Sequence, residues 1–397
     1  MKDYWKDKIP VKKLNKKKVS ITVYILILII ALIVLFCLYI SSQNVRNWID
    51  KNILRKEINQ NSVSTIDLDS ENNYKIYAYD KNIAVLNHNT LKIYNDNGKE
   101  EKSLDVQVNN AMFKSNNRFL AVAEEKGQAV YLISGTEILW KGEVDGNISQ
   151  IHVNKNGYMA VVITDTSYKT VINFYDPNGE KKFVTFLKST RVVDTSISND
   201  NKYLAIAEID SSGSYIQSNV KVISIEKASD KNSTGLDDSI TYIYKADANR
   251  LITNLRYQDK NNLVCMYNDG IDLISNEQNS NLASTNNKKM TFMSVKLTNN
   301  VVTVEEKSSG LFTADSVIQI INTSNQKENI YKAEGVAKDI ITYDDIIGLN
   351  FGTEIHFINT NGWLVKKYIA SQEITNVVLS NKIAGIIYRD KVEIINL

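Results

Sequence analysis

The first strong feature of the chain is an uninterrupted hydrophobic run close to its beginning. Residues 19–40 contain no charged residue, no glycine and no proline. Because an α-helix rises about 1.5 Å per residue, such a run can cross a hydrocarbon layer of roughly 30 Å. The pattern predicts a transmembrane helix over residues 19–40. A buried helix of a soluble domain is the alternative, but uncharged helices of this length are rare there.

The flanks of this run indicate its orientation and its fate. Residues 1–18 carry eight lysines and two aspartates, and cationic flanks stay in the cytoplasm. We therefore expect a cytoplasmic basic tail, with everything after the helix outside the cell membrane. A cleaved signal peptide has a shorter apolar region that ends in small residues. Here the run ends in bulky residues, and Phe36 before Cys37 does not fit a lipoprotein signal. We expect an uncleaved signal anchor.

Residues 41–61 form a linker with weak helical periodicity. Val45, Trp48, Ile49 and Ile53 follow roughly helical spacing, with charges between them. One interpretation is a juxtamembrane helix that extends to about Ile58, with Trp48 near the lipid headgroups. The equal alternative is an amphipathic linker helix that packs on the domain that follows.

From residue 62 onward the pattern changes to short apolar runs separated by polar turns. One motif, an apolar strand, an Asn/Asp turn and a second apolar strand, recurs at residues 113–122, 153–161 and 197–206. In a second motif, an alternating strand ends in Asn-Gly, at Gly98, Gly179 and Gly362. Asn and Gly tolerate the positive φ that tight hairpins require. These patterns predict half-buried antiparallel sheet.

The repeat length indicates the architecture. Phe119 and Tyr158 are 158 − 119 = 39 residues apart, and Tyr158 and Tyr203 are 203 − 158 = 45 apart. A period of roughly 40–50 residues with about four short strands is typical of a β-propeller blade. The innermost strands are expected near Ile76, Met112, Ile151, Ile197, Leu255, Met293, Ile340 and Val377. This predicts an all-β domain of eight blades over residues 62–397. Seven blades, or a pair of stacked β-sandwiches, are the alternatives.

The two ends of this domain predict how the ring closes. Residues 374–397 supply three strands, and residues 63–68 can supply the fourth. Such pairing of N- and C-terminal strands removes exposed sheet edges, which invite aggregation.

One turn carries a resemblance to known propellers. Residues 197–207 read Ile-Ser-Asn-Asp-Asn-Lys-Tyr-Leu-Ala-Ile-Ala. They resemble the Ser-Pro-Asp-Gly-Lys-Tyr-Leu-Ala turn of bacterial WD40-like and quinoprotein-like propellers, without its Pro and Gly. The layout of residues 62–397 also resembles a Clostridium-type family of single-pass membrane propeller proteins of unknown function. The resemblance implies a fold, and it transfers no site because that family has no assigned activity.

Charge narrows the choice of partner. The chain has a formal net charge of +2, and residues 1–18 account for 8 − 2 = +6 of it, so the remainder carries 2 − 6 = −4. A mildly acidic domain is a poor partner for nucleic acid, which requires clustered cations. We expect the membrane and an envelope protein to be the partners of this protein.

The search for chemistry identifies few candidates. His88, His152 and His356 have no metal-ligand spacing, and the two cysteines do not form a cluster with them. Of the three, His152 is expected to be the one that could face the central channel. No nucleophile elbow, phosphate-binding Gly loop or cofactor motif is present. A long loop carries Leu311 and Phe312 at its tip, an apolar pair that is a candidate contact site.

We therefore expect no cofactor, no metal and no enzyme activity. The favoured hypothesis is a membrane-anchored extracytoplasmic propeller that acts as a protein-interaction or scaffold module of the cell envelope. The alternative is a ligand sensor or an enzyme that uses the central channel, since a propeller fold does not determine function. A passive spacer is the third hypothesis. Neither the partner nor the oligomeric state follows from the pattern.

Overall fold

The computed structural model describes residues 16–397, apart from residues 55, 60–62, 231–235, 286–287 and 311–312. The chain divides into two compact units, one up to Glu57 and one from Ile58 onward. Each unit is described by itself.

The first unit contains the apolar helix α1 (Lys16–Ser41) and the short helix α2 (Gln43–Asn52). The stretch Val23–Ser41 of α1 is long and apolar enough to cross a membrane, and none of it is buried in the structure. Its exposed side chains are those expected to contact lipid or to form a signal sequence. The helix therefore lies where the hydrophobic run predicts it.

Polar contacts join α2 to the end of α1. Arg46 donates hydrogen bonds to the backbone carbonyls of Tyr39 (3.1 Å) and Ile40 (2.8 Å), which lack helical partners at the end of α1. The hydroxyl of Tyr39 donates to Asp50 at 2.8 Å, and Lys56 forms an ion pair with Asp50 at 2.8 Å.

The expected juxtamembrane helix is shorter than its periodicity suggested. It ends at Asn52, whereas Ile58 lies in the short strand β1 (Glu57–Asn59) at the boundary of the two units. β1 is hydrogen-bonded in a sheet next to β30 (Leu364–Ile369), and an extended strand cannot also continue a helix. Trp48 on α2 is exposed.

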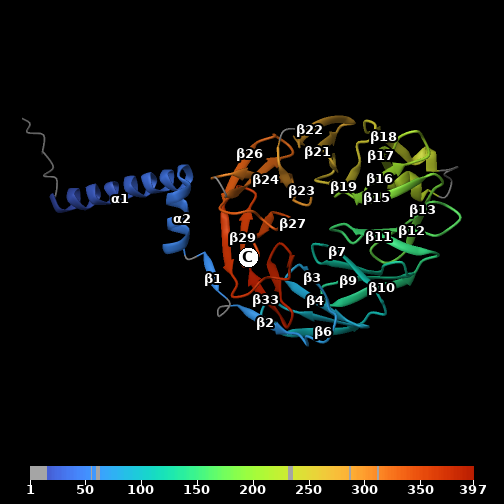
Figure 1. Ribbon diagram of the computed structural model, residues 1–397, viewed down its shortest axis with the longest axis horizontal. Helices are drawn as coiled ribbons and strands as arrows, with labels where there is room; N and C mark the ends of the chain where they lie inside the picture. The colour runs from blue at the N-terminus through green and yellow to red at the C-terminus, as the bar shows by residue number, and fades with distance from the viewer. Residues whose placement is uncertain (1–15, 55, 60–62, 231–235, 286–287, 311–312) are drawn as a thin grey trace, which may run out of the picture. The chain divides into compact units, whose positions relative to one another are not determined.

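The second unit is an eight-bladed β-propeller, as the repeat predicts (Figure 1). Each blade is an antiparallel sheet whose strands follow one another from the axis outward. The innermost strands are β3 (Lys75–Tyr79), β7 (Ala111–Asn116), β11 (Asn147–Val153), β15 (Thr190–Ile197), β19 (Ile252–Tyr257), β23 (Met290–Ser294), β27 (Asp339–Tyr343) and β31 (Asn376–Leu379).

The other strands complete the blades. The second strands are β4 (Asn82–Asn87), β8 (Phe119–Glu124), β12 (Met159–Thr164), β16 (Tyr203–Asp210), β20 (Asn262–Tyr267), β24 (Asn300–Ser308), β28 (Ile346–Asn350) and β32 (Ile383–Ile387). The third strands are β5 (Thr90–Tyr94), β9 (Ala129–Ser134), β13 (Thr170–Tyr175), β17 (Gln217–Ser224), β21 (Gly270–Ser275), β25 (Ala314–Asn322), β29 (Glu354–Asn359) and β33 (Lys391–Asn396). The fourth strands, besides β30, are β2 (Ser64–Asp67), β6 (Glu100–Asp105), β10 (Glu137–Glu143), β14 (Lys181–Leu187), β18 (Ile240–Lys245), β22 (Gln278–Ser284) and β26 (Glu328–Ala333). They are outermost in their blades except β30, outside which β1 adds a fifth strand.

The core lies between blades, because each sheet buries both faces against its neighbours. Leu86 and Leu91 of the first blade, for example, share a cluster with Leu120 and Val122 of the second. The second strands are therefore almost continuously apolar, whereas the outermost strands alternate. One irregular connection, between β17 and β18, contains the short helix α3 (Ile225–Ser229) and a 3₁₀ turn (Leu236–Ser239). The repeat did not predict this helix.

The ring closes through β2, which pairs with β33 in the register Ser64↔Ile394 and Ile66↔Val392. Residues near the start of the propeller thus supply the outermost strand of the last blade. Ile66 is buried in a cluster formed by the first and last blades. This pairing leaves no gap in the ring at the point where the chain begins and ends.

The three Asn-Gly hairpins have one conformation and one environment. Gly98, Gly179 and Gly362 have φ of 73°, 83° and 72°, and each lies in the turn between a third strand and a fourth strand. A Cβ on Gly179 would lie 2.7 Å from Trp140 of the preceding blade. The other two meet the backbones of Thr65 and Ile330 in the same way. The glycines are therefore required both by turn geometry and by contact between blades.

Candidate functional site

The three histidines lie in different parts of the propeller. His88 is exposed in the turn between β4 and β5 and contacts Asn87. His356 is buried on β29, where its Nδ1 lies 3.0 Å from the hydroxyl of Tyr331. Burial, followed by the charge of Lys367, lowers the pKa of His356 to about 4. Among the described residues, no group of three His, Cys, Asp or Glu side chains is placed to hold a metal ion.

Leu311 and Phe312, the candidate contact residues, lie outside the described residues. Their role stays a prediction. Two cavities of the propeller are lined by polar and charged side chains.

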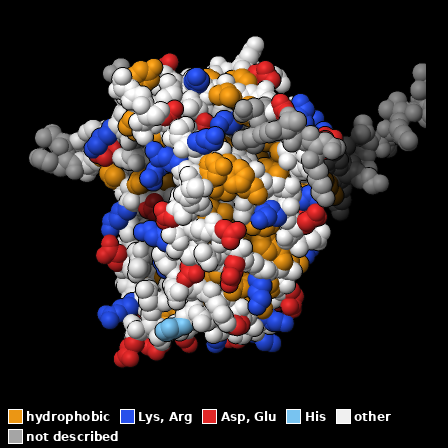
Figure 2. Space-filling model, turned by 90° about the vertical axis from the view of Figure 1, so that its right-hand side faces the viewer, with side chains coloured by type: hydrophobic (Ala, Val, Ile, Leu, Met, Phe, Trp, Pro, Cys, Tyr) orange, Lys and Arg blue, Asp and Glu red, His pale blue; other side chains and the backbone are white. Residues whose placement is uncertain are grey.

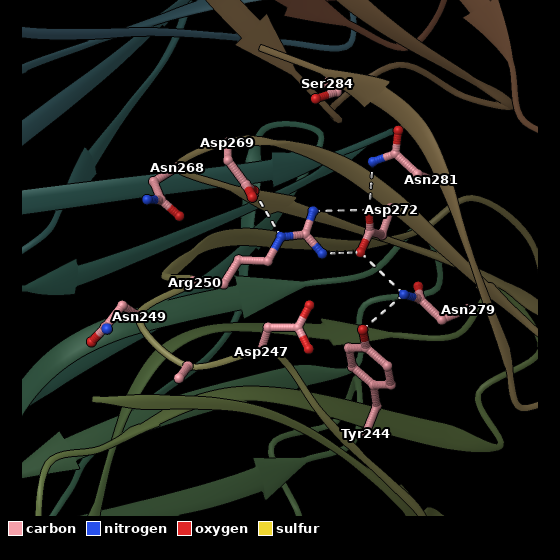
Figure 3. A pocket seen from close by; sticks show the side chains of 11 residues that line it. Tyr244, Asp247, Asn249, Arg250, Asn268, Asp269, Asp272, Asn279, Asn281 and Ser284 are labelled. Atoms are coloured by element: carbon pink, nitrogen blue, oxygen red, sulfur yellow. Dashed lines mark hydrogen bonds and ion pairs between the residues drawn. The ribbon is translucent and has the colours of Figure 1, made fainter. Parts of the chain in front are cut away.

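The larger cavity, of about 500 Å³, is lined mainly by Asp, Asn and Arg side chains around Arg250 (Figure 3). Arg250 precedes β19 and reaches Asp272 on β21 with both terminal nitrogens, one of them at 3.0 Å. Its Nε donates to Asp269 at 2.7 Å. Asn279 and Asn281 of β22 donate to the two oxygens of Asp272 at 3.1 and 2.9 Å.

The charges around this cavity satisfy one another. The guanidinium of Arg250 also lies 4.1 Å from the centre of the Tyr267 ring. Burial alone would raise the pKa of Asp272, but hydrogen bonds from Arg250, Asn281 and Asn279 outweigh it and hold that pKa below its ordinary value. A buried ion pair that is bidentate and hydrogen-bonded in this way needs no ligand. We interpret this cluster as a structural brace of the fifth blade.

Around the axis of the propeller, equivalent positions on the innermost strands carry polar and charged side chains. They are identified by their partners on the second strands: Tyr77↔Ala84, Lys114↔Ala121, His152↔Ala160, Ser196↔Ala205, Arg256↔Val264 and Ser294↔Val302. These positions carry two cations. A third cation, Lys296, follows two residues after Ser294.

These three cations and two other titratable groups, Lys114, His152, Asp194, Arg256 and Lys296, are the axial cluster. They come from five blades, and their charges affect one another. Burial lowers the pKa of Lys296, and Lys114 adds to the effect. Burial also lowers the pKa of His152 to about 3, with further contributions from Lys114 and Arg256.

His152 therefore lies within the electrostatic range of cations on β7 and β19. Its imidazole is neutral at neutral pH. That it faces the channel and takes part in recognition stays a prediction.

Asp194 is the carboxylate of the axial cluster. Its oxygens accept hydrogen bonds from the backbone N–H groups of Thr195 and Leu255, each at 2.9 Å. Burial raises its pKa, and the hydrogen bond from Leu255 opposes the change. Two carboxylates flank the cluster and are engaged elsewhere. Asp344 accepts from Thr298 at 2.6 Å, and Asp339 accepts from the N–H of Ile340 at 2.8 Å.

The three cations of the axial cluster have no such partners. Within the part of the chain that the structure describes, the side chains of Lys114, Arg256 and Lys296 make no hydrogen bond and no ion pair. Burial lowers the pKa of Arg256 too. Lys114 and Lys296 are exposed and Arg256 is half-buried, and the carboxylates of Asp194, Asp339 and Asp344 offset part of their positive charge. Three cations that gather in one region make it a candidate site for an anion.

The second cavity adjoins this cluster. It has a volume of about 290 Å³ and lies between β19, β23 and β27. Its lining is apolar at Met266, Met293, Val295, Ile340 and Ile341, and polar at Asn254, Ser294, Thr342 and Lys296. The hydroxyls of Ser294 and Thr342 are 2.6 Å apart. The cavity therefore combines an apolar surface with one cation of the axial cluster.

The sequence pattern indicated His152 as a candidate but not Lys114, Arg256 or Lys296. The signal that could have found two of them lies in the second strands. Each ring position pairs with Ala or Val in the same place, as Ala121, Ala160, Ala205 and Val264 show. Alignment on these residues, rather than on the turns, identifies Lys114 and Arg256 as equivalents of His152.

Comparison with protein families gives one match. The model of the "Family of unknown function (DUF5711)" matches residues 54–397. No curated protein sequence matches the chain.

Among solved structures, the chain is similar to the dihydro-heme d1 dehydrogenase NirN, solved in complex with DHE, with 12% identity and a TM-score of 0.51 over 84% of this chain and 73% of that one. It is also similar to BamB from Moraxella catarrhalis (12% identity, TM-score 0.49, 84% and 99% covered) and to AztD from Citrobacter koseri (11% identity, TM-score 0.47, 84% and 90% covered). At these identities the likeness concerns the fold alone.

Proposed function

This chain belongs to the DUF5711 family of unknown function, and we propose from its geometry that it is a membrane-anchored propeller that binds an anion at its axis without transforming it. In this proposal α1 is an uncleaved signal anchor. The eight lysines among residues 1–18 hold the N-terminus in the cytoplasm, so the propeller is extracytoplasmic. Its ligand is then a component of the cell envelope or of the medium.

One observation carries the proposal. Lys114, Arg256 and Lys296 come from three blades, affect one another electrostatically and make no side-chain hydrogen bond or ion pair within the described residues. The part of the chain after residue 18 is acidic overall, so a cationic axis is a local feature of the propeller. Fixed cations that converge from rigid strands are preorganised for an anion and lose little freedom when it binds.

Recognition fits this site better than catalysis. Catalysis by an activated nucleophile needs a nucleophile within hydrogen-bond reach of a base. His152 makes no hydrogen bond to a hydroxyl or thiol among the described residues, and both oxygens of Asp194 are held by backbone N–H groups. The function that follows is sensing or capture.

Thermal unfolding of the full-length protein in detergent tests the proposal. A ligand that binds only the folded state raises the melting temperature. Added inorganic phosphate should stabilise the wild-type protein more than an equal ionic strength of chloride. Lys114→Gln should lose most of that gain. Lys332→Gln, which removes an exposed lysine from β26, should retain it. Equal gains in wild type and Lys114→Gln would refute binding at the axis.

A second candidate function, a scaffold for an envelope protein, rests on a separate observation. Several outermost strands expose large apolar side chains, namely Leu139, Phe186, Ile243 and Ile330. Figure 2 views the side that carries β13 and β16–β18 and shows hydrophobic side chains gathered among charged ones. Phe186 packs against Tyr168 with ring centres 4.7 Å apart. Exposed apolar patches often mark protein contacts.

Crosslinking in intact cells tests this second candidate. A photoreactive amino acid in place of Phe186 should give one discrete crosslinked product. The same amino acid in place of Lys332, on the outer strand of another blade, should give none. No product at either position would leave the anion site as the better account.

A further inference from the structure

We propose, building on the anion site above, that the ligand is a small organic anion whose apolar group enters the cavity between β19, β23 and β27. The charged headgroup, a carboxylate or a phosphate, lies beside Lys296 and Arg256. The apolar group contacts Met266, Met293, Ile340 and Ile341. The ligand is thus distinguished from an inorganic ion and from a polyhydroxylated anion.

The lining of the cavity is the first argument. Four of its five apolar side chains, those of Met266, Met293, Ile340 and Ile341, are only half-buried, whereas Val295 is buried. An inorganic ion at Lys296 would leave this apolar surface in water. A ligand with an apolar group would cover it, and burial of apolar surface favours binding.

The volume sets the size of that group. A cavity of about 290 Å³ lies near the lower end of the range for small-molecule sites, roughly 300–1,000 Å³. An apolar cavity of about 150 Å³ accepts benzene. The apolar part of the ligand is therefore expected to have about six carbon atoms, with the remaining space for the headgroup.

The position of the charges fixes the orientation of the ligand. Lys296 is itself a wall of the cavity, whereas Arg256 and Lys114 act on it from the axis. The polar residues Asn254 and Ser294 also belong to the wall, and Ser294 occupies the ring position of β23. A headgroup that faces the axis thus meets cations, and the rest of the molecule meets methionine and isoleucine.

Calorimetric titration of the full-length protein in detergent provides the test. The probes are methyl phosphate and phenyl phosphate, with acetate and benzoate as the second pair. Within each pair the charge is the same and the apolar group differs. We expect phenyl phosphate to bind at least about tenfold more tightly than methyl phosphate, and the carboxylates identify which headgroup is preferred.

Two substitutions locate the apolar group. Ile341→Trp fills the cavity without a change of charge, so the ratio of phenyl phosphate affinity to methyl phosphate affinity should fall to about one. Ile330→Trp, which adds the same volume on the exposed face of β26, should leave that ratio unchanged. Met293→Ala enlarges the cavity and should shift the preference from phenyl toward naphthyl phosphate. If Ile341→Trp does not fold, Met293→Ala alone tests whether the apolar group lies in this cavity.

The possible outcomes distinguish a failure of the apolar-cavity inference from a failure of the proposed anion site. Equal binding of methyl and phenyl phosphate would overturn the inference and leave the anion site intact. A phenyl preference that both cavity variants retain would place the apolar group elsewhere and overturn it too. If no probe of either headgroup binds, both the anion site and this inference are wrong.

Discussion

The guanidinium of Arg250 and the buried carboxylate of Asp272 form a bidentate ion pair in the wall of a cavity of the propeller (Figure 3). Six residues along the chain, Arg256 has no hydrogen bond or ion pair within the described residues. Both arginines are partly buried, so burial alone does not separate them. The pairing does, because the charge of Arg250 is compensated by two carboxylates, whereas that of Arg256 has no hydrogen-bonded counter-charge among the described residues.

The first prediction concerns that ion pair. Asp272→Asn should lower the free energy of unfolding by about 3 kcal/mol, because removal of one partner leaves a buried charge without compensation. Urea denaturation measures the change. Arg250→Met combined with Asp272→Asn should cost less than the sum of the two single changes. A purely additive result would contradict a coupled pair.

The same pair predicts a pH dependence. The pKa of Asp272 in the folded state lies below its ordinary value of 3.8. The folded state therefore binds fewer protons than the unfolded state as this carboxylate titrates. The contribution of the pair is present above about pH 4 and is lost as the pH falls through the folded pKa. Unfolding midpoints of wild type and Asp272→Asn should converge below pH 4. A constant difference down to pH 2 would contradict this.

The second prediction concerns the Asn-Gly hairpins. Gly179→Ala places a Cβ in a backbone conformation with positive φ and within 2.7 Å of Trp140. It should destabilise the protein by about 1–2 kcal/mol. Gly142→Ala is the matched control, because Gly142 does not have a positive φ and its Cβ would lie 3.6 Å from the same ring. Thermal unfolding of both variants checks the difference, and equal midpoints would show that the turn is not strained.

The third prediction concerns ring closure. Ile66 of β2 is buried between the first and last blades, whereas Thr65 on the same strand is exposed. Ile66→Ala should cost about 2–4 kcal/mol through the loss of packing and the cavity it leaves. Thr65→Ala should cost little. Hydrogen exchange should show faster exchange in β33 for Ile66→Ala, and unchanged exchange there would mean that β2 is not needed for closure.

The fourth prediction concerns His152. Its pKa is lowered to about 3 by burial, Lys114 and Arg256, so the unfolded chain takes up a proton at higher pH than the folded one. Stability from this group is therefore full above about pH 6.5 and falls as the pH decreases toward 3. NMR titration of His152 follows its pKa directly. Anion binding should not strengthen between pH 7 and pH 5, and a rise in affinity there would mean that His152 becomes charged.

Much of the fold could be predicted from the sequence, because each blade repeats the same physical pattern. The second strands are apolar since both faces are buried, and Gly98, Gly179 and Gly362 mark turns that need positive φ. These signals are local, and eight of them in succession predict the ring. The end of the linker helix, in contrast, is not determined by local sequence. The competing strand pairing of Ile58 in β1 depends on β30, about 310 residues later.

The axial cluster was harder to predict because the first hairpin of each blade varies in length. Two residues, Asn117 and Arg118, separate β7 from β8, whereas five residues separate β11 from β12 and β15 from β16. A shift of one residue moves a side chain to the other face of a strand. When the turns are aligned, Phe113 matches Val153. Lys114 comes after Phe113, whereas His152 comes before Val153, so the two ring positions do not align. The partners of Arg250, Asp269 and Asp272, lie 19 and 22 residues later, and no local pattern indicates them.

The central claim, that an anion binds at the axis, is tested most directly by calorimetric titration of phosphate into wild type, Arg256→Gln and Lys332→Gln. A hydrogen bond to a charged group contributes about 1.5–3 kcal/mol, so Arg256→Gln should bind roughly 10- to 100-fold more weakly. Lys332→Gln should bind as wild type does. Equal affinities for wild type and Arg256→Gln would contradict the claim.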